Sequence, residues 1–211
     1  MMNLGDIKSH FEALLNRSDI TSALTTLFID QSIARIQRQL RTPLNENKTT
    51  YTFTSQTPSV TLPSDFLEII SLYYGSIELT RVPMSKLRGL VNHPVAGSPT
   101  VFTREQQTLL LHPQPTSDEL TLYYYGEFAP MTANSDENAL ALVAPDAIIY
   151  GALTYASDYY LDERRDIFET KFNQFLLELQ EQANDQELNG GTQAIQPSST
   201  YTDYQSTPSV V

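Results

Sequence analysis

The sequence contains no cysteine and no tryptophan, and only three of its 211 residues are histidine. Without cysteine there is no disulfide framework, thiol nucleophile or thiolate ligand, and a reducing compartment is the simplest context. His10, His93 and His112 are not spaced as the ligands of a metal motif or as part of a catalytic motif. No metal ion or other cofactor is therefore expected.

Positive charge is also scarce, because 13 basic residues face 25 acidic ones and the formal net charge is -12. Nucleic acids and anionic membranes both reward Lys and Arg, so neither is expected as a specific ligand. Residues 131–187 alone carry twelve acidic and three basic residues. The most apolar window, residues 139–156, contains Pro145 and Asp146 and is shorter than the roughly 20 residues that span a bilayer. A buried helix, and no membrane partner, is predicted.

Glycine motifs that bind phosphates or dinucleotides are absent, as is the nucleophile elbow of the hydrolases. Two acid pairs, Asp65 with Glu68 and Asp158 with Asp162, are candidates for the catalytic residues of a two-carboxylate hydrolase. Such chemistry needs one acid whose pKa is raised by burial, and the sequence shows no site of that kind. Surface charge and helix capping are the favoured interpretation, and no catalytic residue is predicted.

What the chain does have is one very apolar helix at residues 144–161. Pro145 suits the first helical position, and Asp146 suits the positive end of the helix dipole. Polar side chains occur only on one narrow strip, at Asp146, Thr154, Ser157 and Asp158. The remaining surface, which includes Tyr159 and Tyr160, predicts a helix that is enclosed on most sides.

Other helices are predicted on either side of it in the sequence. One covers residues 3–16, and a second follows the capping signal Ser18-Asp19 and ends before Pro43. The last begins at Asp162 as N-cap and runs to about residue 187. Its apolar residues recur at helical spacing as a packing seam: Phe168, Phe172, Phe175, Leu179 and Ala183. The second helix carries the basic stripe Arg35, Arg38, Arg41, and the last carries the acidic stripe Glu178, Glu181, Asp185.

Between these helices, residues 45–130 are rich in Thr, Tyr, Val and Pro and alternate as half-buried strands do. Six or seven strands are predicted, too few and too short to suggest a parallel sheet with crossover helices, and one short helix at residues 83–91. Tyrosines cluster at residues 73–74, 123–125 and 159–160. Because their neighbours are not basic, core or interface packing is favoured over base stacking.

The predicted class is α+β: a helical bundle formed by N- and C-terminal helices, with a β-rich insertion and an extended C-terminal tail. The corresponding segments are 1–44, 45–130, 131–187 and 188–211. The tail is rich in Ser, Thr, Gln and Pro and cannot form a core. Its isolated apolar residues are predicted to anchor it, as an extended strand, on a partner: Ile195, Tyr201, Tyr204, Val210 and Val211.

Several segments of the sequence resemble those of a known protein family. They are Phe28-Ile29-Asp30 through Arg41-Thr42-Pro43, Leu62-Pro63-Ser64-Asp65-Phe66 with the strand after it, Ser98-Pro99-Thr100, Leu109 through Pro113, Leu120 through Tyr125, and the helix at 144–161. Together, over about residues 20–185, they resemble the head-to-tail adaptor (connector) proteins of tailed bacteriophages. The resemblance implies a dodecameric ring at the head-tail junction of the virion, made in the host cytoplasm. It also implies the portal above the ring, tail or nozzle proteins below it, and DNA that passes through without specific binding.

Two alternatives stay open at this point: a stopper or tail-terminator ring, and a tail-associated glycan hydrolase. The basic and acidic stripes are expected to face each other, within a subunit or across the joint between subunits of the ring. Some of the acids of residues 131–187 are expected to face the channel, although an outward face is nearly as well supported. The tail is expected to bind the portal or, as second choice, a neighbouring adaptor subunit.

Overall fold

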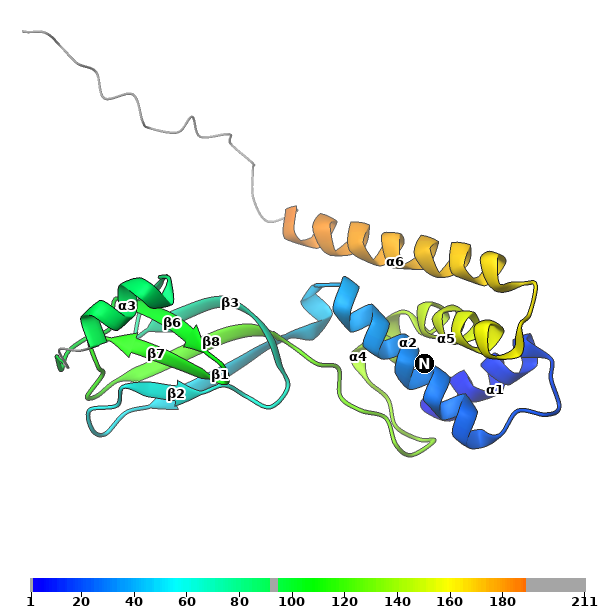
Figure 1. Cartoon of the computed structure of the whole chain (residues 1–211), viewed down its shortest axis with the longest axis horizontal. Coiled ribbons are helices and arrows are strands. Elements are labelled where there is room, and N and C mark those ends of the chain that lie inside the picture. The colour runs from blue at the N-terminus through cyan, green and yellow to red at the C-terminus, as the bar shows by residue number, and fades with distance from the viewer. Residues whose placement is uncertain (1, 92–94, 189–211) are drawn as a thin grey trace, which may run out of the picture.

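The computed structural model describes residues 2–91 and 95–188 and has two lobes joined side by side (Figure 1). Helices from both ends of the chain form the helical lobe, and the strands between them form the β lobe. Within the described residues this arrangement confirms the α+β class with a β-rich insertion. The helical lobe contains α1 Leu4–Leu15, α2 Ser22–Gln39, the 3-10 turn η1 Pro43–Asn45, α4 Ala139–Val143, α5 Pro145–Tyr160 and α6 Arg165–Leu188.

Helix α5 is the centre of the helical lobe, where α1, α2 and α6 pack around it. Its side chains from Ala147 to Leu153 are buried with the single exception of Tyr150, so the predicted enclosure is confirmed for this part. At its end the prediction is wrong, because the Tyr159 side chain is 60% exposed. Thr154 and Ser157, predicted on the polar strip, are buried instead. All of this burial occurs inside one chain, and so α5 by itself gives no argument for a ring.

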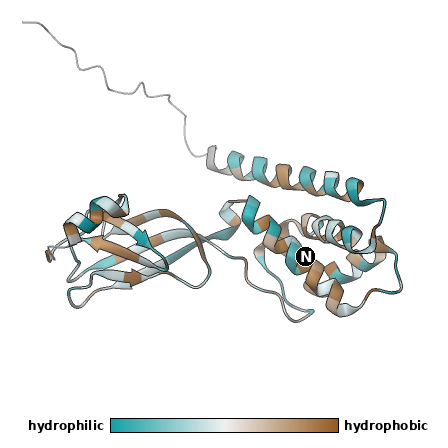
Figure 2. Cartoon of the chain, in the orientation of Figure 1, coloured by the Kyte–Doolittle hydropathy of each residue, from teal (hydrophilic) through white to brown (hydrophobic). Residues whose placement is uncertain are grey.

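Glycine allows α2 and α5 to approach closely. A Cβ atom on Gly151 would lie 2.2 Å from Ser32 Oγ and 2.9 Å from the Phe172 ring. The Ser32 hydroxyl donates a hydrogen bond of 2.8 Å to the Ile148 carbonyl, so a polar side chain is satisfied inside the core. The seam predicted on α6 closes the other side of α5, and Figure 2 shows its apolar residues in bands along that helix. Phe168, Phe172, Leu179 and Ala183 are buried, and Phe175 is partly buried.

Two predicted helix starts are wrong for the same reason: an arginine already holds the proposed capping carboxylate. Helix α2 begins after Thr21, whose hydroxyl accepts a hydrogen bond from the Leu24 N–H, while Asp19 is paired with Arg17. Helix α6 begins at Arg165 rather than at Asp162. The Asp162 carboxylate accepts hydrogen bonds from the backbone N–H and the guanidinium of Arg164.

The β lobe consists of two four-stranded sheets with one hydrophobic cluster formed by residues of both. The first sheet has the order β1 Glu46–Thr52, β8 Glu119–Gly126, β3 Phe66–Tyr74 and β4 Ile77–Glu78. The second has the order β2 Ser59–Thr61, β7 Thr108–His112, β6 Val101–Glu105 and β5 Thr80–Arg81. The described residues contain eight strands rather than six or seven. Strands β5 and β6 are parallel, and α3 Met84–Val91 lies between them in sequence, so the prediction of no such crossover is wrong for this pair.

Pairing of β1 with β8 closes the β lobe. The two strands are antiparallel without a register shift from Glu46 opposite Tyr125 to Thr52 opposite Glu119. Since β1 follows η1 and β8 leads to the loop before α4, this ladder brings the two chain crossings between the lobes together. Residues 42–47, 64–65 and 126–130 meet there, and we call this region the interlobe joint.

Candidate functional site

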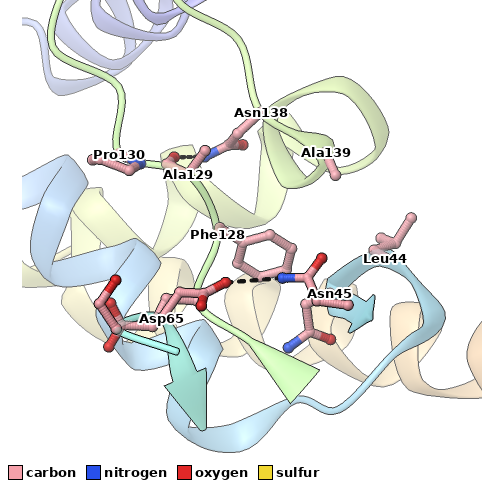
Figure 3. Close-up of a pocket in the computed structure, with 11 residues that line it drawn as sticks. Leu44, Asn45, Asp65, Phe128, Ala129, Pro130, Asn138 and Ala139 are labelled. Carbon is pink, nitrogen blue, oxygen red and sulfur yellow. Dashed lines mark hydrogen bonds between the residues drawn. The ribbon is translucent and has the colours of Figure 1, made fainter. Parts of the chain in front are cut away.

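A polar network holds the interlobe joint. Figure 3 shows the Phe128 ring at its centre, with Asp65 on one side and Asn45 on the other. Asn45 is buried; its Nδ2 donates to the Gly126 carbonyl at 3.2 Å, and its Oδ1 accepts from the Thr42 N–H at 3.1 Å. Phe128 belongs to the hydrophobic core of the helical lobe. The Asn45 side chain on the first crossing is thus fixed to the backbone of the second crossing at Gly126.

Asp65, from the phrase Leu62-Pro63-Ser64-Asp65-Phe66, is the second centre of this network. Its carboxylate accepts hydrogen bonds from Asn47 Nδ2 at 3.0 Å and from the Tyr124 hydroxyl at 3.1 Å. Its carbonyl accepts the Glu127 N–H at 2.7 Å. Burial raises the pKa of the Tyr124 phenol, and the hydrogen bond and the negative charge of Asp65 act in the same direction. Asp65 of this segment therefore ties β1, β8 and the second crossing together at the interlobe joint.

A cavity of about 480 Å³ opens at the joint. Its lining is mixed: Leu44, Phe128 and Pro130 are apolar, and Asp65 and Glu127 are acidic. The amide of Asn138 lies at the edge and donates to the Ala129 carbonyl at 3.0 Å. The lining includes the hydroxyl of Ser64, and none of the described hydrogen bonds joins it to a base.

The two acid pairs weighed as hydrolase candidates are engaged in structural contacts. Glu68 pairs with Arg41 across the joint at 3.1 Å, and Asp65 belongs to the network above. Asp158 forms an ion pair with Arg165. Hydrogen bonds from the side chain and backbone of Arg164 lower the pKa of Asp162 to about 2. A hydrolase needs one acid with a raised pKa, and these contacts act in the opposite direction for Asp162.

Potential metal ligands do not gather within residues 2–91 and 95–188, where no group of three His, Asp or Glu side chains could hold an ion. His10 is exposed on α1, and His112 ends strand β7. His93 lies outside the described residues.

The basic stripe of α2 is divided among three environments. Arg35 forms two hydrogen bonds with Glu169 on α6, one of them 2.9 Å long, and its guanidinium lies 4.3 Å from the centre of the Phe172 ring. The bond from Arg35 lowers the pKa of Glu169. Arg41 pairs with Glu68 in the joint, whereas Arg38 is exposed. The partner of Arg35 on α6 is therefore Glu169, which sequence reasoning missed.

The acidic stripe faces outward on α6. Glu178, Glu181 and Asp185 are exposed, and Glu178 accepts a hydrogen bond from Gln174 on the same helix. Among the ion pairs of the described residues none joins this stripe to Arg35, Arg38 or Arg41. A meeting of the two stripes across a joint between subunits stays a prediction.

The tyrosine clusters divide between core and surface, as alternation along a strand requires. Tyr74 and Tyr124 are buried in the β lobe. Tyr73 and Tyr123 lie on the outer face of the first sheet with their rings 6.0 Å apart, and the Lys48 ammonium lies 5.7 Å from the Tyr123 ring centre. With Ile70 they border an open groove of about 620 Å³, which the sequence did not single out.

Two apolar features of the helical lobe were also missed. At the corner between α5 and α6, Leu161 is 90% exposed and has a left-handed backbone with φ of 53°. Between α1 and the start of α5 there is a groove of about 370 Å³ bordered by Leu14, Val143, Pro145 and Tyr150. For the first feature, the sequence held one signal: Leu161 stands at the end of the predicted helix, where glycine is the usual residue.

Residues 2–196 match the SU10 adaptor protein family. The chain belongs to this family of phage head-tail adaptors. The match includes both helical segments and the β lobe, and it extends the resemblance over residues 20–185 to the first helix and the start of the tail. No curated protein matches the chain.

Membership of an adaptor family implies a structural virion component with head or tail partners. None of the helices in the described part of this adaptor-family chain is long and apolar enough to cross a membrane. The predicted tail anchors, Ile195, Tyr201, Tyr204, Val210 and Val211, lie outside the described residues.

Proposed function

We propose that the chain is a ring-forming head-to-tail adaptor, which joins the portal to the tail and forms part of the DNA channel. The observation that carries this proposal is the family match, because it covers both helical segments and the β lobe between them. Twelve copies are the expected number, as the resemblance implies. The net charge of -12 supports passage of DNA without retention, since phosphates are held by basic surfaces.

Charge supports a specific arrangement of neighbouring copies. Arg38 is exposed on α2, and Glu178, Glu181 and Asp185 are exposed on α6. In the proposed ring, Arg38 of one copy faces this acidic stripe of the next. Exposed pairs contribute about 0–1 kcal/mol each, so they set the register of neighbours more than the stability of the ring.

The remaining acids of residues 131–187 suit a channel wall. Like-charged walls repel the phosphates of DNA and keep them moving, whereas basic walls would retain them. Mapping the acids onto the assembled ring tests this part of the proposal. A neutral or basic channel surface would contradict it.

The tail, residues 188–211, is the proposed contact with the portal. Its Thr, Tyr and Val content suits an extended strand paired with an exposed strand edge, with Ile195, Tyr201, Tyr204, Val210 and Val211 as anchors. Truncation after Asn189 should leave the fold intact, because the buried cores lie before this residue, and should abolish attachment to the portal. A full-length variant with the five anchors changed to Ser is the matched control for tail length. Undiminished attachment of the truncated chain would refute the role of the tail.

Copy number tests the ring itself. Native mass spectrometry of the chain bound to its portal should show one closed ring of twelve copies. One or two copies per portal would contradict the proposal. Assembly with tail components alone would instead favour a stopper or tail-terminator ring.

A further inference from the structure

The outer face of the first sheet presents aromatic rings at a groove. Tyr73 and Tyr123 border this groove of about 620 Å³ together with Ile70, and we call it the tyrosine groove. Ile70 is 42% exposed and Tyr123 is 38% exposed. The face of a tyrosine ring attracts Arg and Lys, as the Lys48 ammonium beside Tyr123 illustrates. The tyrosine groove is therefore suited to a partner that brings cations.

Carboxylates accompany the tyrosines. Strand register and alternation place three exposed glutamates on the same face: Glu46, Glu78 and Glu119. Within residues 2–91 and 95–188 none of the three takes part in an ion pair. Lys48 shares the face, and Glu68 is already paired with Arg41. The unpaired side chains thus give this face an excess of two negative charges.

Helix α3 forms the opposite outer face of the β lobe. It packs on β6 and β7 of the second sheet, and its buried Leu87 does not belong to the cluster between the two sheets. Thr103 of β6 points away from that cluster, in contrast to Phe102, and it is buried as well. We conclude that α3 covers the second sheet on the side away from the first sheet.

The surface of α3 is basic. Lys86 and Arg88 are exposed, and the helix contains no acidic residue. Glu105 lies 3.8 Å from Arg88, too far for a hydrogen bond, and the Arg88 side chain is 75% exposed. Even with Glu105 counted, this face has an excess of one positive charge. Residues 79–117 as a whole contain four basic residues and one acidic residue, although the chain has a net charge of -12.

We propose that α3 of one copy docks on the tyrosine groove of the next copy. This deepens the proposed function and rests on it, because it names a contact between neighbouring subunits of the ring. Charge complementarity selects the occupant: the cations of α3 match the rings and carboxylates that the same chain carries on its other face. Since the two faces lie on opposite sides of one lobe, the contact is heterologous, the kind that closes into a ring.

The positions of the two surfaces along the lobe permit this contact. Figure 1 shows α3 at the end of the β lobe that is away from the helical lobe. Strand β3 begins beside the joint at Phe66, so Tyr73 and the turn at Gly75 lie toward that same distant end. A Cβ atom on Gly89 of α3 would meet nothing within 4 Å, which leaves the helix open to close approach. Copies that stand side by side can therefore touch through α3 and the tyrosine groove.

Charge reversal with rescue tests the docking. Native mass spectrometry counts copies on the portal over a range of chain concentrations. Lys86→Glu with Arg88→Glu should raise the concentration that fills half of the portals by about tenfold, and Glu78→Lys with Glu119→Lys should do the same. The variant with all four changes should return to within about threefold of the parent chain, because opposite charges face each other again. All four side chains are exposed, so the melting temperatures should match that of the parent.

The matched control combines Lys86→Glu and Arg88→Glu with Glu137→Lys and Glu163→Lys, which change two exposed acids outside the first sheet. This variant has the net charge of the parent, yet it should assemble as poorly as the α3 double variant. Equal recovery of the control would mean that net charge alone matters, and it would overturn the docking.

The remaining outcomes separate the docking from the ring. A parent that forms rings, with α3 double variants that form them equally well, would overturn the docking and leave the proposed function. No recovery in the variant with four changes would overturn the second copy as occupant, as would α3-dependent binding of DNA or of another protein. A parent that forms no ring on the portal would overturn the proposed function itself.

Discussion

The two lobes are built in different ways from one chain. The β lobe is a single continuous stretch, whereas the helical lobe needs segments from both ends of the sequence. Each lobe has its own hydrophobic cluster, and α5 is covered by α1 and α2 from the other end of the sequence as well as by its neighbour α6. The β lobe can therefore form from its own residues, but the helical lobe forms only when its two segments meet.

Pairing of β1 with β8 connects folding of the β lobe to assembly of the helical lobe. Once this ladder forms, residues 44 and 128 lie on either side of one joint, and the free loop between the two helical segments is eliminated. Closing a loop costs entropy that grows with its length, so a folded insertion makes assembly of the bundle easier. The β lobe thus contributes to the stability of a lobe to which it donates almost no buried side chains.

The largest expected effect tests how independent the lobes are. In Gly151→Ala the new Cβ would collide with Ser32 Oγ and the Phe172 ring, and the Ser32 hydrogen bond to Ile148 would be displaced. We expect a loss of about 3 kcal/mol in the free energy of unfolding, measured with urea. Hydrogen exchange should accelerate in α2, α5 and α6 while β7 and β8 stay protected.

The matched control is Gly89→Ala in α3 of the β lobe, where the new Cβ meets nothing within 4 Å. Alanine is the better helix former, so the variant should be up to about 1 kcal/mol more stable. Equal acceleration of exchange in both lobes of Gly151→Ala would show that they unfold as one unit.

The next effect concerns the joint. Asn45→Ala leaves the Thr42 N–H and the Gly126 carbonyl without their partner in a buried position. An unsatisfied buried group costs about 1–3 kcal/mol, and we expect a loss of about 2 kcal/mol in unfolding free energy, with the single urea transition separating into two.

Asn47→Ala is the comparison variant, because Asn47 is exposed and the Asp65 carboxylate that it bonds keeps the Tyr124 hydroxyl as a partner. Its effect should stay within about 0.5 kcal/mol. If the two variants behave alike, the buried amide is not what couples the lobes.

Sequence patterns predicted the helical lobe better than the β lobe, for a physical reason. The period of α5 and the seam of α6 extend over four or more turns, so several residues report the same face. Strands β4 and β5 have two residues each, too few to show alternation, and so the parallel pair of β5 with β6 was not predicted.

Contacts between elements were harder to predict than the elements. The stripe on α2 was visible, but whether Arg35 meets Glu169 or Glu178 depends on how far α6 is shifted along α2. Capping failed at Asp19 and Asp162 because Arg17 and Arg164 compete for the carboxylates. Leu161 is exposed because its backbone is left-handed, a conformation that leucine disfavours. Sequence patterns rest on the conformations that residues prefer, so they could not predict this one.

The smallest expected effect is a dependence on pH at the corner between α5 and α6. Because Arg164 lowers the pKa of Asp162 to about 2, the charged carboxylate stabilises the folded state above the unfolded pKa of about 3.8. This contribution is lost as the pH falls through about 2, when the folded carboxyl group also takes up a proton. Asp162→Asn should lower the unfolding free energy at pH 7 by about 1 kcal/mol, a value reduced for solvent screening.

Urea titrations at neutral and acidic pH measure the difference between Asp162→Asn and the parent chain, and this difference should vanish as the pH approaches 2. Asp166→Asn is the control, since the Asp166 side chain is 94% exposed and its contact with Arg165 is 3.6 Å long. It should match the parent chain at every pH. A difference for Asp162→Asn that persists unchanged into acid would mean that the neutral carboxyl group holds the corner as well as the charged one does. The rigidity of the corner between α5 and α6 would then come from the backbone bonds to Ser157 and from the bond of Arg164 to the Leu15 carbonyl of α1, without the ion pair.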